Sequence, residues 1–247
     1  MSSSHALHYI ERGITLIQHK TVRGFVLWPI IINAILLLCF SIYAYGQLSW
    51  FVDSWVHSLP SWLSFLSAII KLLAVLFLII STMFTFAIFT TVLAAPCYCL
   101  VAEKVALLLN HPVPSTALTF DAMWYLCWRS LGRECQKMVY YVPRVLLLVI
   151  ISFIPVLNAI SPVLWALWGA WMISIQFVDY AADNDLVGAK ETRALLGKEK
   201  INTLLFGGLI MLGMLIPIVN IVMGTIAVAA ATAYWVDLYQ PTPQQNS

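Results

Sequence analysis

Long stretches without a single charged residue constrain this chain more than any other feature of its sequence. There are four such runs, at residues 24–52, 72–102, 145–178 and 201–236. A helix of about 20 apolar residues crosses the ~30 Å hydrocarbon core of a bilayer. The chain is also 62% hydrophobic and only 10% charged, whereas soluble domains are about 25% charged. We therefore expect an all-α integral membrane protein that forms a single membrane domain over residues 1–247.

The first two runs are typical of ordinary spanning helices. We place them at about residues 25–45 and 72–95, with Pro96 ending the second.

The third and fourth runs, 145–178 and 201–236, differ because each is about 35 residues long and is broken near its middle. Both carry the pattern Ile-Pro-x-x-Asn, and the breaking residues are Pro155, Asn158 and Pro162 in one and Pro217, Asn220 and Gly224 in the other. Each half is about 15 residues, or about 22 Å of helix, which is too short to cross. We predict two re-entrant helical hairpins, an arrangement that points towards a transport site; two Pro-kinked spanning helices are the alternative.

Positive charge is concentrated in three segments of the chain. The segment between the first two spans, residues 46–71, holds only Lys71 of the 13 Lys and Arg residues. The others lie in the N-terminal segment, in 103–144 and in 179–200, which the positive-inside rule places in the cytoplasm. We therefore expect a multi-pass protein with a cytoplasmic helical layer over 103–144. We interpret the acidic residues after the third run as part of a solvated connector; they are Asp179, Asp183 and Asp185.

A basic stripe is predicted on a helix over residues 123–141. Arg129, Arg133 and Lys137 recur every fourth residue, with Glu134 beside them, and this spacing keeps them on one helix face. The stripe has two interpretations, contact with lipid phosphates or a lining that attracts an anion.

Glu103 and Lys104 come directly after the second run. They mark the interface or neutralise each other; alternatively, Glu103 pairs with an arginine of the stripe or carries a proton.

Residues 21–24 form the candidate anion-binding site. Thr21 can cap a helix start, Gly24 relaxes the backbone, and Arg23 offers two parallel donors to an oxyanion. Free N–H groups at a helix N-terminus, here those of Arg23 and Gly24, favour a tetrahedral anion, and Val22 belongs to the same segment. The alternative is that Lys20 and Arg23 are ordinary cytoplasmic flanks of a span.

Other functional classes find little support. A net charge of +2 is too small for a nucleic-acid interface. The five cysteines lie in or beside apolar runs without metal-site spacing, so we expect no metal and no cofactor. No catalytic motif is present, and we do not expect an enzyme.

The chain resembles the CysZ-type sulfate transporter (sulfate permease) family of bacterial inner membranes from about Tyr9 to Tyr239. The resemblance is carried by these ordered matches: Arg23-Gly24-Phe25-Val26 with Pro29, Ala94-Ala95-Pro96 with Glu103, Arg133-Glu134 with Lys137, Phe153-Ile154-Pro155, Ser161-Pro162, and Asp179-Tyr180 with Asp183-Asn184. It implies sulfate uptake for cysteine synthesis by a homo-oligomer of short and re-entrant helices. The anion-binding motif of the family falls on Thr21, Arg23 and Gly24, with Gly24 in place of a frequent second arginine.

Together these observations predict sulfate transport within membrane lipid. Thr21, Val22, Arg23 and Gly24 would bind sulfate at the entrance. The positive potential beyond it would come from Arg129, Arg133 and Lys137, with Glu103 and Glu134 orienting them. The rival hypothesis is a non-transporting membrane protein that assembles or regulates other transporters.

Overall fold

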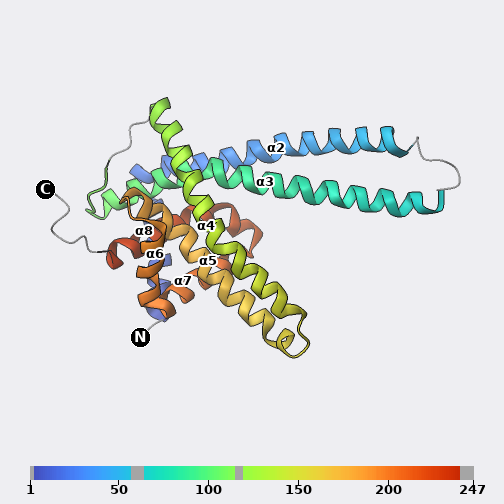
Figure 1. Cartoon of the computed structure of the whole chain (residues 1–247). Coiled ribbons are helices and arrows are strands. Elements are labelled where there is room, and N and C mark those ends of the chain that lie inside the picture. The colour runs from blue at the N-terminus through green and yellow to red at the C-terminus, as the bar shows by residue number, and fades with distance from the viewer. Residues whose placement is uncertain (1–2, 57–63, 115–118, 240–247) are drawn as a thin grey trace. The chain divides into compact units, whose positions relative to one another are not determined.

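A computed structural model describes residues 3–56, 64–114 and 119–239 of the chain, and these are helical almost throughout (Figure 1). In chain order the elements are α1 (Ser3–Ile17), α2 (Lys20–Val56), α3 (Ser64–Leu108), α4 (Phe120–Phe153), η2 (Leu157–Ile160), α5 (Ser161–Asn184), α6 (Ala189–Leu196), η3 (Gly197–Glu199), α7 (Lys200–Met214) and α8 (Pro217–Leu238). The described residues contain no strand, and the predicted all-α fold is confirmed.

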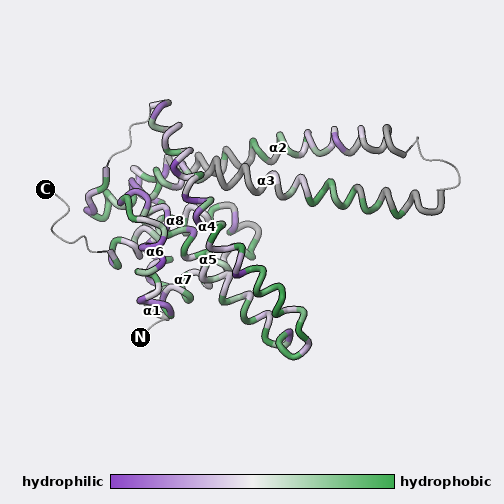
Figure 2. Tube along the Cα trace, in the orientation of Figure 1, coloured by the Kyte–Doolittle hydropathy of each residue, from purple (hydrophilic) through white to green (hydrophobic). Residues whose placement is uncertain are grey.

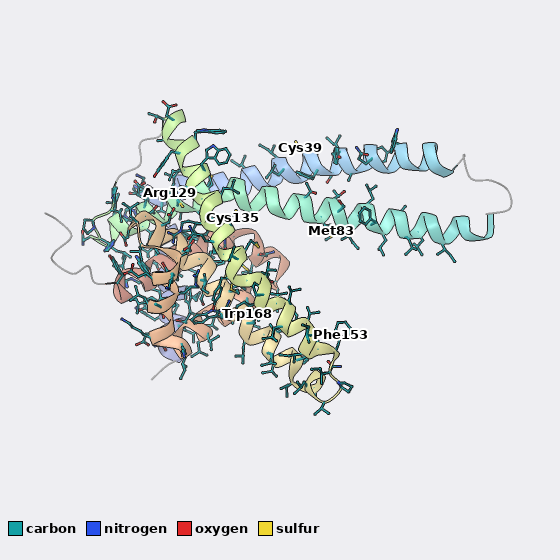
Figure 3. The ribbon with its side chains drawn as sticks, in the orientation of Figure 1. Cys39, Met83, Arg129, Cys135, Phe153 and Trp168 are labelled. Carbon is teal, nitrogen blue, oxygen red and sulfur yellow. The ribbon has the colours of Figure 1, made fainter. Side chains whose placement is uncertain are left out.

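The chain divides into two compact units. One consists of Ile31–Ala94, and the other, which we call the core unit, combines Met1–Ile30 with Ala95–Ser247. In the Ile31–Ala94 unit, large apolar side chains such as Ile42, Phe77 and Met83 are more than half exposed; Figure 3 shows Met83 on this surface. An apolar surface of this kind suits contact with lipid better than contact with water.

Helices α2 and α3 are longer than the sequence predicted. They contain the expected spans at about 25–45 and 72–95, but α2 runs for 37 residues and α3 for 45. Most of the loop expected over 46–71 is therefore helical, and its residues 57–63 lie outside the described part. Pro96 does not end the second helix and lies inside it. Charge and hydropathy mark the edge of a bilayer, whereas a helix continues until the backbone is broken or capped, and a single proline is tolerated in membrane helices.

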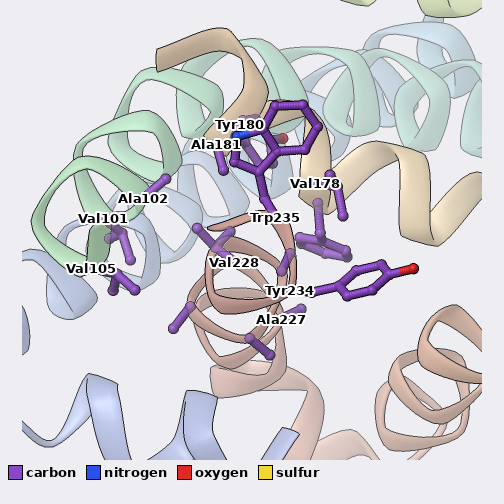
Figure 4. Close-up of a cluster of buried hydrophobic side chains, with 14 of the residues drawn as sticks. Val101, Ala102, Val105, Val178, Tyr180, Ala181, Ala227, Val228, Tyr234 and Trp235 are labelled. Atoms are coloured by element: carbon purple, nitrogen blue, oxygen red, sulfur yellow. The ribbon is translucent and has the colours of Figure 1, made fainter. Parts of the chain in front are cut away.

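The core unit is built around α5, which packs against α7 and α8, while α1 packs against α7 and α8 in turn. Small side chains make the close approach of these helices possible. Ala227, Ala229, Ala230 and Ala231 of α8 are fully buried. Figure 4 shows part of this cluster, including Ala227 and Tyr234 with residues of α3 and α5.

Helix α4 joins two segments that the sequence analysis treated separately. It begins after Thr119, whose hydroxyl accepts a hydrogen bond from the N–H of Ala122, an ordinary N-cap. It then continues through Pro143 to Phe153. The predicted helix at 123–141 and the first half of the predicted hairpin are thus one helix of 34 residues.

The two predicted breaks occur near the expected positions. In the third run, α4 stops at Phe153 and α5 starts at Ser161, with Pro162 in its first turn. In the fourth run, α7 stops at Met214 and α8 starts at Pro217. Only α7 has the expected length of about 15 residues. Asn220 and Gly224 do not break the chain, because α8 continues through both.

Two helical stretches of the described residues are long and apolar enough to cross a membrane, Trp124–Phe153 and Leu157–Asn184. Only 6% and 28% of their most apolar windows are buried, unlike the core helices of a soluble protein. Phe153 and Val156 at the tip are 83% and 82% exposed. Figure 2 shows that the outer part of this α4–α5 hairpin is mostly hydrophobic, with a hydrophilic segment at its tip. The first stretch includes much of the region 103–144 that the sequence assigned to a cytoplasmic layer.

We expect Gly207→Ala to destabilise the core unit, because an added Cβ would lie 1.9 Å from the carbonyl oxygen of Ala170 and 2.4 Å from Oγ of Ser174. Overpacking of this kind costs about 1–3 kcal/mol or more. Gly208→Ala is the matched control, since its Cβ would meet only the Cβ of Ala170 at 3.9 Å and alanine favours the helix. Thermal unfolding in detergent should show a lower Tm for the first variant alone. Equal Tm values would contradict the tight α5–α7 contact.

Candidate functional site

Three cations of α4 face two carboxylates of α5 and form a ladder of ion pairs, to which we refer as the α4–α5 ladder. Arg129 Nη2 lies 2.9 Å from Asp183 Oδ2, and Arg133 pairs with Asp179 and, at 3.4 Å, with Asp183 Oδ1. Lys137 Nζ lies 3.5 Å from Asp179 Oδ2. The residue numbers rise along α4 as they fall along α5, so the ladder joins antiparallel helices. The predicted basic stripe therefore faces protein along its length.

Arg133 lies at the centre of the ladder and makes a bidentate contact. Its Nε and Nη2 both donate to the carboxylate of Asp179, Nε at 3.1 Å. Its remaining nitrogen, Nη1, donates to the carbonyl oxygen of Val187 at 2.8 Å. A planar guanidinium held by paired oxygens has a fixed orientation, so Arg133 is anchored rather than free to swing.

Lys137 is the most buried cation of the ladder, with a side chain only 3% exposed. Its ammonium lies 2.6 Å from Glu134 Oε1 and 5.4 Å from the ring centroid of Tyr180. Gln176 completes this end, because its Nε2 donates to Glu134 Oε1 at 3.1 Å and to the Tyr180 hydroxyl at 3.0 Å. A buried ammonium needs such partners, since burial without them is very costly.

The charges of the ladder cancel. Arg129, Arg133 and Lys137 are matched by Glu134, Asp179 and Asp183. The positive potential that the sequence predicted is therefore neutralised in this structure. A cavity between these side chains is about 10 Å³, room for about one water molecule and not for a sulfate ion.

The acidic residues after the third run do not form a solvated connector, so that prediction is wrong. Asp179 and Asp183 are each 3% exposed and lie within α5. Asp185 is also held, by His111 Nε2 at 2.9 Å and by Trp235 Nε1 at 2.6 Å. The spacing of the charged residues in the sequence could have indicated this pairing. Asp179 and Asp183 are four residues apart, as are the cations that they meet, and this pattern is expected of two helices that pair along their lengths.

Glu103 lies on α3 and is 1% exposed. Its Oε1 lies 2.8 Å from Nζ of Lys104, as in the interpretation that these neighbours neutralise each other.

A larger cavity opens beside the Lys137 end of the ladder. It measures about 340 Å³ and has Glu134, Lys137 and Gln176 on its polar side. The apolar side is formed by aromatic and methionine side chains, including Phe177 and Met214. The surface of this cavity is mostly apolar, and Lys137 is the cation among its lining residues.

Residues 21–24 lie in the first turn of α2, after the short turn that ends α1. Val22 is fully buried, whereas Thr21, Arg23 and Gly24 are exposed. The N–H groups of Val22 and Arg23 both donate to the carbonyl oxygen of His19, at 3.0 and 2.9 Å. These N–H groups are thus already used, and the donors offered to an anion here are mainly side chains.

The structure brings together four of the nine predicted site residues, Arg129, Arg133, Glu134 and Lys137. No hydrogen bond or ion pair between described residues joins residues 21–24 to the ladder. Three residues of the site were not predicted from the sequence. Asp179 and Asp183 hold the cations Arg133 and Arg129, and Gln176 donates to the carboxylate of Glu134.

Comparison with known proteins gives a consistent result. The sequence model of the family described as "Sulfate transporter CysZ/Etoposide-induced protein 2.4" matches residues 9–223. The chain is 40% identical over 228 residues to a sulfate transporter CysZ of Pseudomonas fluorescens (strain Pf0-1), covering 92% of this chain and 91% of that protein. It is 41% identical to the sulfate transporter CysZ of Pseudomonas syringae pv. tomato, with 92% and 90% covered. Identity to the protein of that name from Pectobacterium atrosepticum is 35%, with 95% and 85% covered.

We expect Arg133→Met or Asp179→Leu alone to destabilise the protein by about 3–5 kcal/mol, because each leaves a buried charge without its partner. The double variant should lose much less than the sum of the two single losses. The control pair is Arg12 and Asp237, which are 3.1 Å apart with side chains 32% and 43% exposed; Arg12→Met should cost at most about 1 kcal/mol. Denaturant unfolding in micelles gives all these values. Strictly additive losses at positions 133 and 179 would contradict the pairing.

Proposed function

This chain belongs to the sulfate transporter CysZ/etoposide-induced protein 2.4 family, and we propose from that membership that it carries sulfate across a bacterial inner membrane into the cytoplasm. The observation that carries the proposal is the 40% identity to a sulfate transporter CysZ across 92% of the chain. The family consists of transporters rather than enzymes. By analogy with the family, the imported sulfate would serve cysteine synthesis.

The exposed apolar helices support a location in the membrane. In the core unit, Arg144 lines the same groove as Trp168 and Trp171, and the ring of Tyr141 stacks on Trp168 with centroids 6.1 Å apart. Arginine and aromatic residues at one level are typical of a membrane interface. We propose that this level is the cytoplasmic surface of the bilayer.

The hairpin beyond that level is short. From Arg144 to Phe153, α4 rises about 14 Å at 1.5 Å per residue, about half of a hydrocarbon core of ~30 Å. This length supports re-entry from the cytoplasmic side rather than a crossing. Hairpins that reach only half-way cannot form a complete pathway alone, which supports a homo-oligomer as the working unit.

The cavity beside the ladder is the proposed pathway for the anion. Lys137 contributes a cation to its wall, and the surrounding carboxylates cancel the charge of the ladder overall. A passing sulfate must therefore compete with Glu134 and Asp179 for Lys137, whose Nζ they approach to 2.6 and 3.5 Å. Competition of this kind weakens binding enough for the ion to leave. Glu103, Arg129 and Arg133 would act on the pathway indirectly, by positioning.

Residues 21–24 are the proposed entrance site. Arg23 is exposed and supplies a fork of donors suited to paired sulfate oxygens. Thr21 adds a hydroxyl, Gly24 leaves the surface beside Arg23 open, and the buried Val22 anchors the turn.

Sulfate flux into liposomes that contain only this protein tests the proposed function. Labelled sulfate should accumulate faster than in empty liposomes, and excess unlabelled sulfate should compete with it. Flux equal to that of empty liposomes, from protein that is folded and inserted, would refute transport and leave the non-transporting, assembling role.

Arg23→Ala should weaken sulfate binding to the purified protein by about 1.5–3 kcal/mol, the scale of a hydrogen bond to a charged group, or roughly ten- to hundredfold in Kd. Lys20→Ala removes a neighbouring exposed cation and is the matched control, with a loss of less than about threefold expected from its distant point charge. Calorimetric titration measures both. Small and equal losses would mean that Arg23 is only a flank of the helix and that sulfate binds elsewhere.

A further inference from the structure

The core unit has an amphipathic groove that the proposed pathway does not use. It lies between α4, α5 and α7 and measures about 440 Å³. Its walls are five leucines and two tryptophans, and two cations, Arg144 and Lys200, complete the lining. A groove with apolar walls and a cationic end fits a ligand that has a hydrocarbon chain and an anionic head.

The two cations stand at equivalent points of the chain. Arg144 is the last charged residue before the uncharged run 145–178, and Lys200 is the last before the run 201–236. Leu147 and Leu148 follow one turn after Arg144, and Leu204 follows one turn after Lys200, all lining the groove. The polar end of the groove thus coincides with the charge boundary of both hairpins, where lipid headgroups meet the hydrocarbon core.

These cations also lack carboxylate partners, in contrast to those of the ladder. No salt bridge among the described residues includes Arg144, Arg193 or Lys200, and the nearby Glu199 accepts a hydrogen bond from Asn202 at 2.7 Å. Arg144 and Arg193 both lie over the ring of Tyr140, at 3.7 and 4.6 Å.

We propose that the groove binds one anionic phospholipid, with its phosphate between Arg144 and Lys200 and an acyl chain along the leucines. Two basic residues at a bilayer surface favour an anionic over a zwitterionic headgroup by roughly tenfold or more. The proposal rests on the membrane location in the proposed function but not on sulfate transport, and it is tested without sulfate.

Native mass spectrometry of the full chain, released from micelles that contain phosphatidylglycerol or phosphatidylcholine, measures the bound lipid. We expect one retained phosphatidylglycerol per chain and a preference of about tenfold over phosphatidylcholine. Arg144→Gln with Lys200→Gln should abolish the preference. The matched control is Lys190→Gln with Lys198→Gln, which removes the same charge from exposed positions outside the groove and should keep it.

A second variant separates the acyl chain from the headgroup. Leu164→Trp fills the apolar end of the groove and should reduce retention of both lipids, with both cations intact. Inorganic phosphate at equal concentration should not displace the lipid. Three results would overturn the proposal: equal retention of the two lipids by the unaltered chain, an equal loss in the control variant, or dissociation of an oligomer on replacing Arg144 and Lys200, which would assign the groove to a contact between subunits.

Discussion

The ion pairs between α4 and α5 fix the register of these helices, and the placement of the other polar groups in the core unit depends on them. Arg133 against Asp179 and Arg129 against Asp183 place Arg144 at the level of Trp168. Beyond that level, apolar side chains such as Phe153 and Val156 are exposed, and before it the charged side chains of Lys137, Asp179 and Asp183 are buried. The ladder thus determines where the chain changes from protein-facing to lipid-facing.

A ladder with a four-residue repeat could slip by one helical turn and still form ion pairs. Two contacts oppose the slip: Gln176 holds Glu134 at the Lys137 end, and the carbonyl oxygen of Val187 holds Arg133 at the centre. Buried ion pairs contribute little net stability, and their best-attested role is to specify one arrangement. The stability of the unit comes instead from α5 against α7 and α8, where Gly207 allows backbone contact. The face of α5 that meets α4 therefore specifies the helix register, and the face that meets α7 and α8 stabilises the core unit.

The fold class and the helix breaks at Pro155 and Pro217 could be predicted, because charge-free runs and prolines act locally. The ends of the helices could not be predicted. Helix α3 continues past Pro96 and α4 past Pro143, because packing and membrane context decide whether a helix continues through a proline. The cations of the ladder were predicted, but their partners were not. In the sequence alone, a carboxylate that follows an apolar run is expected to lie in water. The burial of Asp179 becomes evident only when α4 and α5 are seen to pair. The charge balance of the site depends on that pairing, so the sequence predicted a basic stripe where the structure has a neutral ladder.

With the register set by the ladder, the proposed re-entrant α4–α5 hairpin reaches only about half-way through the bilayer. Labelling of a single cysteine measures this directly. In a variant whose native cysteines are replaced, Asn158→Cys at the tip of the hairpin is exposed to an impermeant thiol reagent added outside intact cells, with the same reagent after permeabilisation as reference. We expect the tip to resist labelling from outside, because a re-entrant hairpin of this length ends within the hydrocarbon core. Ready labelling from outside would show that the hairpin crosses the membrane and would contradict the account.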